Sequence, residues 1–199
     1  MNLIRAHLGG LLRFSGREDR SSFWIWLAIV FAGMMVVWMG YFASMIARIE
    51  QFAGQHPDQV TRTIGPGSYS VQIRDGNPEI GTVFTQSILV MAVIVAVGIV
   101  LVAAAVTRRL HDSGRSGWWA LPVPVLLFSG LAVMSRLFAL TAVAGAGDAP
   151  PDGFFPLFGT VMLVNLAYLA SLGLLAVLCC LPGQPGENRY GARPEGGAR

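Results

Sequence analysis

Charge is scarce in this sequence. Only 13% of the 199 residues are Asp, Glu, Lys or Arg, about half of the usual share in a globular domain. Lysine does not occur, so all 14 basic residues are Arg. With 54% hydrophobic residues and a mean hydropathy of +0.58, the chain has too little polar surface to be mainly a soluble domain.

The sequence also lacks the short motifs of common enzyme and redox sites. It has no phosphate-binding loop, no Gly-x-Ser-x-Gly turn, no Cys-x-x-Cys pair and no dinucleotide fingerprint. Cys179 and Cys180 are adjacent, and side chains of neighbouring helical residues point about 100° apart, which suits neither a mutual disulfide nor a metal site. The three histidines are far apart in sequence. We therefore expect no metal and no cofactor, and we predict that the chain is not an enzyme.

What the chain has instead is four long stretches without a charged residue. They cover about 22–47, 80–107, 116–135 and 153–181, and about 20 apolar residues suffice for a helix to cross a bilayer. The predicted fold class is an all-α membrane protein, a four-transmembrane-helix bundle. Its single integral domain spans residues 1–191 and includes an outer loop at 48–79. A flexible cytoplasmic tail follows at 192–199.

The arginines are distributed unequally around these stretches. Ten of the 14 lie in the amino-terminal segment, the second connection or the tail, and four lie in the first and third connections. Short Arg-rich segments stay in the cytoplasm, so both termini are predicted inside. Orientation then explains the basic residues, which disfavours nucleic acid as a partner. Ahead of the first span, an amphipathic interfacial helix is expected from the common face of Leu3, Ile4, Leu8, Leu11 and Leu12.

Three local patterns give further expectations. Ser15 and Glu18 have capping-box spacing, which predicts that the first long helix begins there. Pro122 and Pro124 predict a kink near the cytoplasmic end of the third span. Alternating apolar residues at 69–73, between turn-forming glycines, predict a small hairpin in the outer loop.

Near the middle of the fourth stretch, Asn165 is the only strongly polar side chain, and Tyr168 follows one turn later. Two interpretations stay open. The amide bonds to a neighbouring helix, or the two residues line the path of a small transporter or channel. No stretch contains an acid, a basic residue or a histidine, which argues against proton-coupled transport.

Three polar, glycine-rich segments flank the stretches on the predicted cytoplasmic side. They read FSGREDRSSFW at 14–24, RRLHDSGRSGWW at 108–119 and PGQPGENRYG at 182–191. At these residues the chain resembles a bacterial inner-membrane family known as the domain of unknown function 805 family. The resemblance implies a multi-pass protein of the bacterial inner (plasma) membrane. It implies no chemistry, because no activity is established for that family.

The polar segments supply the candidate site residues. Guanidinium groups match phosphate oxygens in bidentate geometry, and tryptophan rings lie at headgroup depth. An anionic phospholipid is the candidate ligand, whereas a partner protein, a homo-oligomer or a purely topological role of the arginines also stays open. The expected anion- or lipid-binding residues are Arg17, Arg20, Arg108, Arg109, Arg115, Trp118 and Trp119, and the expected structural polar cluster is His111, Asp112, Asn188, Arg189 and Tyr190.

A bundle of four helices should bring the three polar segments together. Asp112 is expected to pair with Arg115, or across the bundle with Arg17 or Arg20. The tail around 188–190 is expected to fold back over this cluster, because prolines and glycines turn the chain at 182–186. An enzyme, such as a lipid-headgroup transferase, would need Arg17, Arg20, His111 and Asp112 to meet in one pocket.

Overall fold

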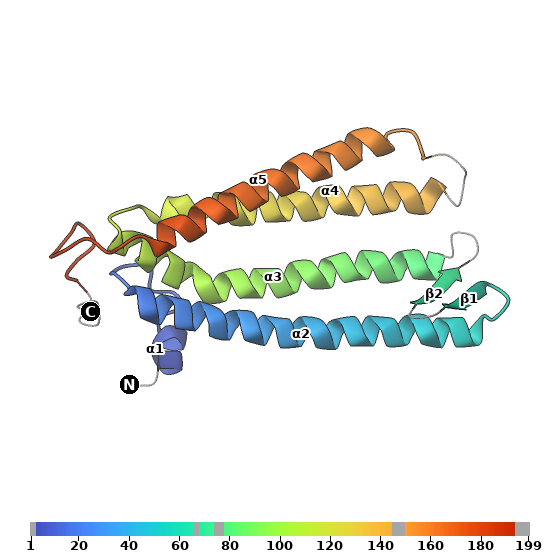
Figure 1. Ribbon diagram of the computed structural model, residues 1–199, viewed down its shortest axis with the longest axis horizontal. Helices are drawn as coiled ribbons and strands as arrows, with labels where there is room; N and C mark the ends of the chain where they lie inside the picture. The colour runs from blue at the N-terminus through green and yellow to red at the C-terminus, as the bar shows by residue number, and fades with distance from the viewer. Residues whose placement is uncertain (1–2, 66–67, 74–77, 145–149, 194–199) are drawn as a thin grey trace.

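Four long helices run side by side in the computed structural model (Figure 1). The structure describes residues 3–65, 68–73, 78–144 and 150–193, with side chains omitted at 64, 68–73, 78–85 and 142–144. Each long helix contains a segment apolar and long enough to cross a membrane, so the predicted fold class is confirmed. The long helices are α2 (Arg20–Gln55), α3 (Pro78–Asp112), α4 (Pro122–Ala144) and α5 (Phe154–Cys180).

Shorter elements lie at the two ends of these helices. A seven-residue helix, α1 (Leu3–Gly9), packs against α2, and a short 3-10 helix, η1 (Gly117–Ala120), connects α3 to α4. Strands β1 (Val60–Gly65) and β2 (Ser68–Ile73) pair antiparallel, which confirms the predicted hairpin. Figure 1 shows α1 and both termini at one end and the hairpin at the other. We call the first of these the Arg-rich end, made of residues 3–22, 108–121 and 181–193.

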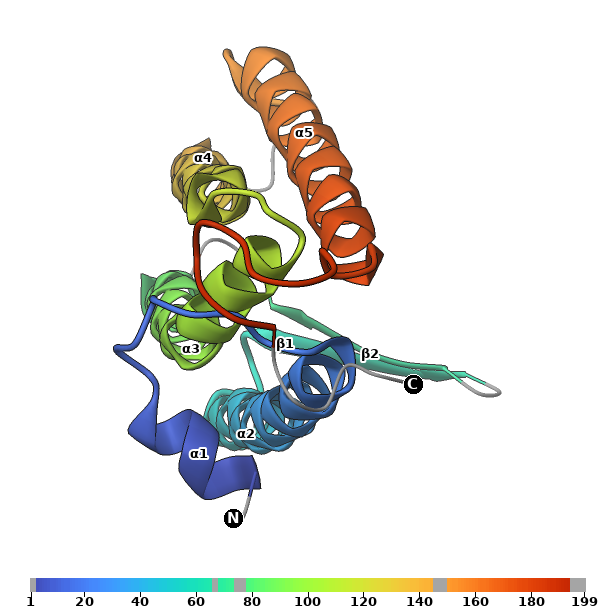
Figure 2. The same ribbon diagram turned by 90° about the vertical axis from the view of Figure 1, so that its left-hand side faces the viewer.

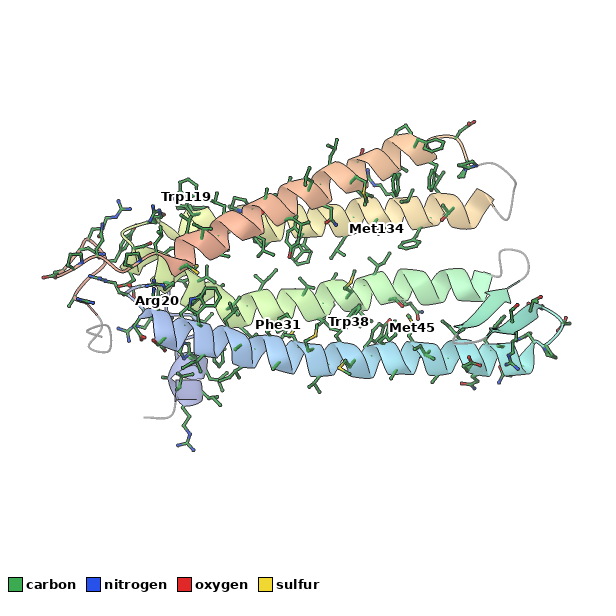
Figure 3. The ribbon with its side chains drawn as sticks, viewed as in Figure 1. Arg20, Phe31, Trp38, Met45, Trp119 and Met134 are labelled. Atoms are coloured by element: carbon green, nitrogen blue, oxygen red, sulfur yellow. The ribbon has the colours of Figure 1, made fainter. Side chains whose placement is uncertain are left out.

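The core cluster lies at the Arg-rich end. Its buried side chains come from α2, α3 and α5, including Phe23, Trp26, Leu110 and Leu178. Viewed from that end, α2, α3, α4 and α5 follow one another, and α5 lies at the edge beside α4 (Figure 2). Further along, apolar side chains project outward from the helices (Figure 3), as the lipid-facing sides of membrane helices do.

The start of α2 differs from the capping-box prediction. Asp19 is the N-cap, and its side chain accepts a hydrogen bond from the Ser22 amide at 3.0 Å. Glu18 is buried instead, because His7 and Arg108 bind its carboxylate. The predicted box between Ser15 and Glu18 is therefore wrong, and α2 begins at Arg20.

The prolines of the third span also act differently from the prediction. Pro122 and Pro124 lie in the first turn of α4, where backbone N–H groups have no intrahelical acceptor and proline costs no hydrogen bond. They start a helix and do not kink one. The helix then continues past Arg136 to Ala144, beyond the predicted boundary at residue 135.

The lead-in helix is shorter than its apolar pattern suggested. It ends at Gly9, so Leu11 and Leu12 lie beyond it, and Leu12 is 85% exposed. Leu3 and Leu11 pack against the core cluster. The predicted flexible tail lies outside the described residues after Arg193.

Candidate functional site

The turn after α3 sets the geometry of the Arg-rich end. The Gly114 amide donates to the His111 carbonyl at 3.0 Å, and the Arg115 amide donates to the Leu110 carbonyl at 2.9 Å. This is the hydrogen-bond pattern of a Schellman motif, whose C′ residue adopts the left-handed conformation that glycine tolerates. Gly114 has φ of +77°. The turn leaves Arg109 and Asp112 on the last turn of the helix and sends Arg115 away from them.

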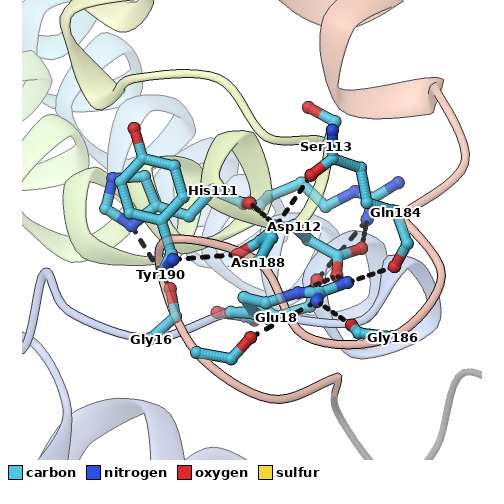
Figure 4. A network of polar contacts seen from close by, with 12 residues as sticks. Gly16, Glu18, His111, Asp112, Ser113, Gln184, Gly186, Asn188 and Tyr190 are labelled. Atoms are coloured by element: carbon cyan, nitrogen blue, oxygen red, sulfur yellow. Dashed lines mark hydrogen bonds and ion pairs between the residues drawn. The ribbon is translucent and has the colours of Figure 1, made fainter.

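Asp112 lies at the centre of the polar network (Figure 4). Its Oδ1 accepts hydrogen bonds from Arg17 Nε at 2.9 Å, and it lies 2.8 Å from an Arg17 terminal nitrogen. Its Oδ2 binds Arg109 at 2.5 Å. The predicted pairing across the bundle with Arg17 is confirmed, whereas Arg20 and Arg115 do not bind this carboxylate.

Arg109 joins α3 to the end of α5. Its side chain is 1% exposed and donates to the Cys179 carbonyl at 2.8 Å and to the Leu181 carbonyl. Carbonyls at a helix C-terminus lack intrahelical donors and carry partial negative charge, so a buried cation is favourable there. Since Asp112 supplies the counter-charge, Arg109 is both paired and hydrogen-bonded.

A second ion-pair group was missed by the sequence analysis. The Glu18 carboxylate lies 2.5 Å from His7 Nε2 and accepts from Arg108 Nε at 2.9 Å. Arg108 also donates to the Gly10 and Arg13 carbonyls, at 3.1 and 2.6 Å. His7 stacks on Trp26 with 4.7 Å between ring centroids. Glu18 thus holds α1 and the lead-in loop against α3.

The tail folds back over these ion pairs, as predicted. Arg17 donates to the carbonyls of Gln184 and Gly186, both at 2.6 Å. Asn188 Nδ2 donates to the His111 carbonyl at 3.0 Å, and the Tyr190 ring stacks on His111 at 3.7 Å between centroids. Figure 4 shows residues of all three polar segments within this network.

The Arg189 side chain lies at the edge of the same network. It donates to the Gly114 carbonyl at 3.3 Å, and its guanidinium lies 4.7 Å from the centre of the Tyr190 ring. All five residues of the expected polar cluster therefore come together.

The remaining candidate residues lie outside this network, and of these Arg115 is half-buried. Arg20 begins α2 and is exposed, and Trp119 lies at the same end of the molecule (Figure 3). Trp118 and Trp119 on η1 are 76% and 52% exposed. Within the described part of the chain, the side chains of Arg20 and Arg115 have no polar partner. The structure therefore separates these two arginines from Arg17, Arg108 and Arg109.

Two hollows flank the network. A recess of about 480 Å³ is lined by residues that include Arg13, Ser15 and Asp19. A largely apolar cleft of about 620 Å³ is lined by Phe14, by residues of α3 and by η1, including Trp118. Among the described residues, no group of three or more His, Cys, Asp or Glu side chains is placed to hold a metal ion.

Asn165 and Tyr168 lie far from the polar network, on α5. Asn165 is exposed and Tyr168 is half-buried. In the described residues neither the Asn165 amide nor the Tyr168 hydroxyl has a polar partner. Asn165 therefore makes no hydrogen bond to another described helix of the same chain, and whether its amide bonds across a helix interface or lines a path stays open.

These features define a class: a multi-pass helical membrane protein whose connecting segments interlock at one end through buried arginines. The chain matches the family described as "Protein of unknown function (DUF805)" over residues 11–192, and it belongs to that family. No curated protein and no solved structure matches it. The matched range includes all three polar segments, and the function has to be inferred from the site itself.

Proposed function

We propose that this chain is a non-enzymatic protein of the bacterial inner membrane whose Arg-rich end faces the cytoplasm and binds anionic phospholipid. Buried arginines hold the helices together at this end, and surface arginines contact lipid phosphates. No cofactor or nucleic acid takes part.

The observation that carries the proposal is the division of the arginines into two groups. Arg17, Arg108 and Arg109 donate to carboxylates and carbonyls of the chain itself. Arg20 and Arg115 have no such acceptor in the described residues. A guanidinium without an internal partner at the membrane surface is free to bind a phosphate in bidentate geometry.

The surroundings of Arg115 favour a lipid over a free anion. Ser116, Gly117 and Trp118, the next residues along the chain, line the apolar cleft. Trp118 is 76% exposed, and a tryptophan at the headgroup level is favourable. The apolar cleft that Trp118 lines suits an acyl chain. A small phosphorylated solute would gain nothing from either feature.

The charge balance supports a cytoplasmic position for this end. Residues 3–22, 108–121 and 181–193 contain nine Arg and four acidic residues, whereas the connections at 48–79 and 136–152 contain four Arg and six acidic residues. Positively charged segments stay inside during insertion, and the cytoplasmic leaflet carries the anionic lipid that attracts them.

The state of the two buried carboxylates supports a non-enzymatic role. Glu18 is bound by His7 and Arg108, and Asp112 is bound by Arg17 and Arg109. A carboxylate saturated in this way is not presented to a substrate as a general acid or base. We therefore infer that these two carboxylates stabilise the fold and do not take part in catalysis.

Lipid retention by the purified full-length protein tests the proposal. Native mass spectrometry would count molecules of phosphatidylglycerol or phosphatidylcholine that stay bound to the wild type and to the variant Arg20→Gln/Arg115→Gln. Each surface Arg contributes about 1 kcal/mol toward anionic lipid, so the double variant should bind phosphatidylglycerol about 30-fold more weakly. Phosphatidylcholine binding and the thermal midpoint should stay unchanged.

Arg136→Gln is the matched control, because it removes one exposed arginine from α4 outside the Arg-rich end. This variant should retain phosphatidylglycerol like the wild type. Equal losses in the control and in the double variant would indicate nonspecific charge attraction and would contradict a lipid site at the Arg-rich end.

A further inference from the structure

The outer face of α5 carries the polar side chain of Asn165 at the level of the hydrocarbon core. Asn165 is exposed and lies about 17 Å from the start of α5 and about 23 Å from its end, at 1.5 Å per residue. It is therefore near the middle of the bilayer. Its amide and the Tyr168 hydroxyl are without polar partners in the described chain.

Lipid tails do not satisfy these groups. An amide carries two N–H donors and a carbonyl acceptor, and burying them among hydrocarbon without hydrogen bonds is unfavourable. No other described helix covers this face either, since α5 lies at the edge with α4 as its long neighbour (Figure 2). The missing partner must come from another molecule in the membrane.

A second copy of the chain supplies the required chemistry at the required depth. Copies with the same arginine distribution insert in the same orientation, so Asn165 of each copy lies at the same level. An amide is self-complementary, and two amides related by a two-fold axis can each donate to the other. A different partner would need its own polar group at this level.

The residues around Asn165 are compatible with close helix packing. Phe158, Met162 and Leu169 are 44%, 49% and 55% exposed on that side of the helix. Gly173, two turns further on, has no atom near the position that a Cβ would occupy, which leaves room for a second helix backbone.

We propose that two copies of this chain pair through the face of α5 that carries Phe158, Met162, Asn165, Leu169 and Gly173, with the two Asn165 amides hydrogen-bonded to each other. The proposal does not depend on lipid binding at the Arg-rich end, because this face contains no arginine and no residue that lines the two hollows.

Cysteine cross-linking in native membranes tests the pairing. In the full chain with Cys179→Ala and Cys180→Ala, a single cysteine is introduced as Leu169→Cys or, as a matched control, as Leu163→Cys. Both leucines are exposed on α5, at 55% and 70%, but they lie about 40° and about 160° around the helix from Asn165. Oxidation should give a covalent dimer with Leu169→Cys and not with Leu163→Cys.

Asn165→Leu tests the amide itself. Polar side chains between membrane helices strengthen association by amounts that correspond to about 3- to 30-fold in the dissociation constant, so this substitution should weaken the dimer by that factor. The thermal midpoint of the monomer should not change, since the amide has no partner within the described chain.

Four results would overturn the proposal. They are the absence of any dimer, equal cross-linking from Leu163→Cys, a dimer that is as tight with Asn165→Leu as with Asn165, and unfolding of the monomer caused by Asn165→Leu. The last result would place the amide in the fold of one chain.

Discussion

Replacing Asp112 by Asn tests how the Arg-rich end is held together. The side chains of Arg17, Arg109 and Asp112 are 0%, 1% and 6% exposed, and each oxygen of the carboxylate serves a different arginine. Asn keeps the shape of Asp but removes the negative charge. It also turns one acceptor into an NH₂ group that faces a guanidinium donor.

The expected cost follows from this burial. Removing one partner of a buried ion pair typically costs about 3 to 5 kcal/mol, because the other charge stays buried without compensation. Glu18, the other buried carboxylate among the described residues, is committed to Arg108 and His7, so it does not replace Asp112. The retained amide oxygen still accepts from one arginine, so we expect a loss near 3 kcal/mol in the free energy of unfolding.

Reversible unfolding of the purified full-length protein by SDS in mixed micelles, followed by tryptophan fluorescence, would measure this loss. Trp26 is buried in the core cluster and reports on this end. Asp19→Asn is the matched control, because Asn caps a helix as well as Asp does, and it should cost less than about 0.5 kcal/mol. If Asp112→Asn costs no more than this control, the ion pairs do not hold the helices together.

Three further outcomes are expected. Gly183→Ala places a Cβ against the Asp112 carboxylate and should cost about 1 to 3 kcal/mol while making the tail more sensitive to protease; Gly40→Ala, where a Cβ meets nothing, should do neither. Arg17→Gln removes donors to the tail carbonyls and should speed amide hydrogen exchange at 184–191; unchanged exchange would show that the tail is held by other contacts. Alkaline phosphatase fused after Ser116 should be inactive and active when fused after Gly65, and the reverse result would invert the topology.

The spans were predictable from the sequence because charged residues are excluded from the hydrocarbon core, and a helix needs about 20 uncharged residues to cross it. The convergence of the polar segments followed as well, since short connections leave their ends at the same side of four neighbouring helices. The actual ion pairs depend on the turn after α3. Arg109 and Asp112 lie three residues apart on the same face of the last turn of α3. Gly114 then ends the helix, so Arg115 does not lie on that face.

Glu18 shows where local patterns are insufficient. Ser15 and Asp19 are both good N-caps, and spacing alone does not choose between them. The choice is made by tertiary contacts, because a buried Glu18 binds Arg108, which is 90 residues away in sequence. His7 was missed for the same reason, since its partner depends on how α1 docks.

Asn165 shows a different limit. The sequence places the residue at mid-membrane but does not tell which helices surround α5. The structure shows that α5 lies at the edge, and for this reason the amide has no polar partner among the described residues.

The position of the core cluster explains why the polar network determines how the long helices are arranged. Lipid tails are as apolar as leucine, so burying apolar side chains between membrane helices provides little driving force for their association. In this chain the core cluster and the buried ion pairs lie at the same end, where Arg109 binds the final carbonyls of α5. That end therefore sets the positions of α2, α3 and α5, and the remainder of α5 is left with one long neighbour. The same arrangement that fixes α5 at its last turn thus exposes the Asn165 face to whatever lies beside it in the membrane.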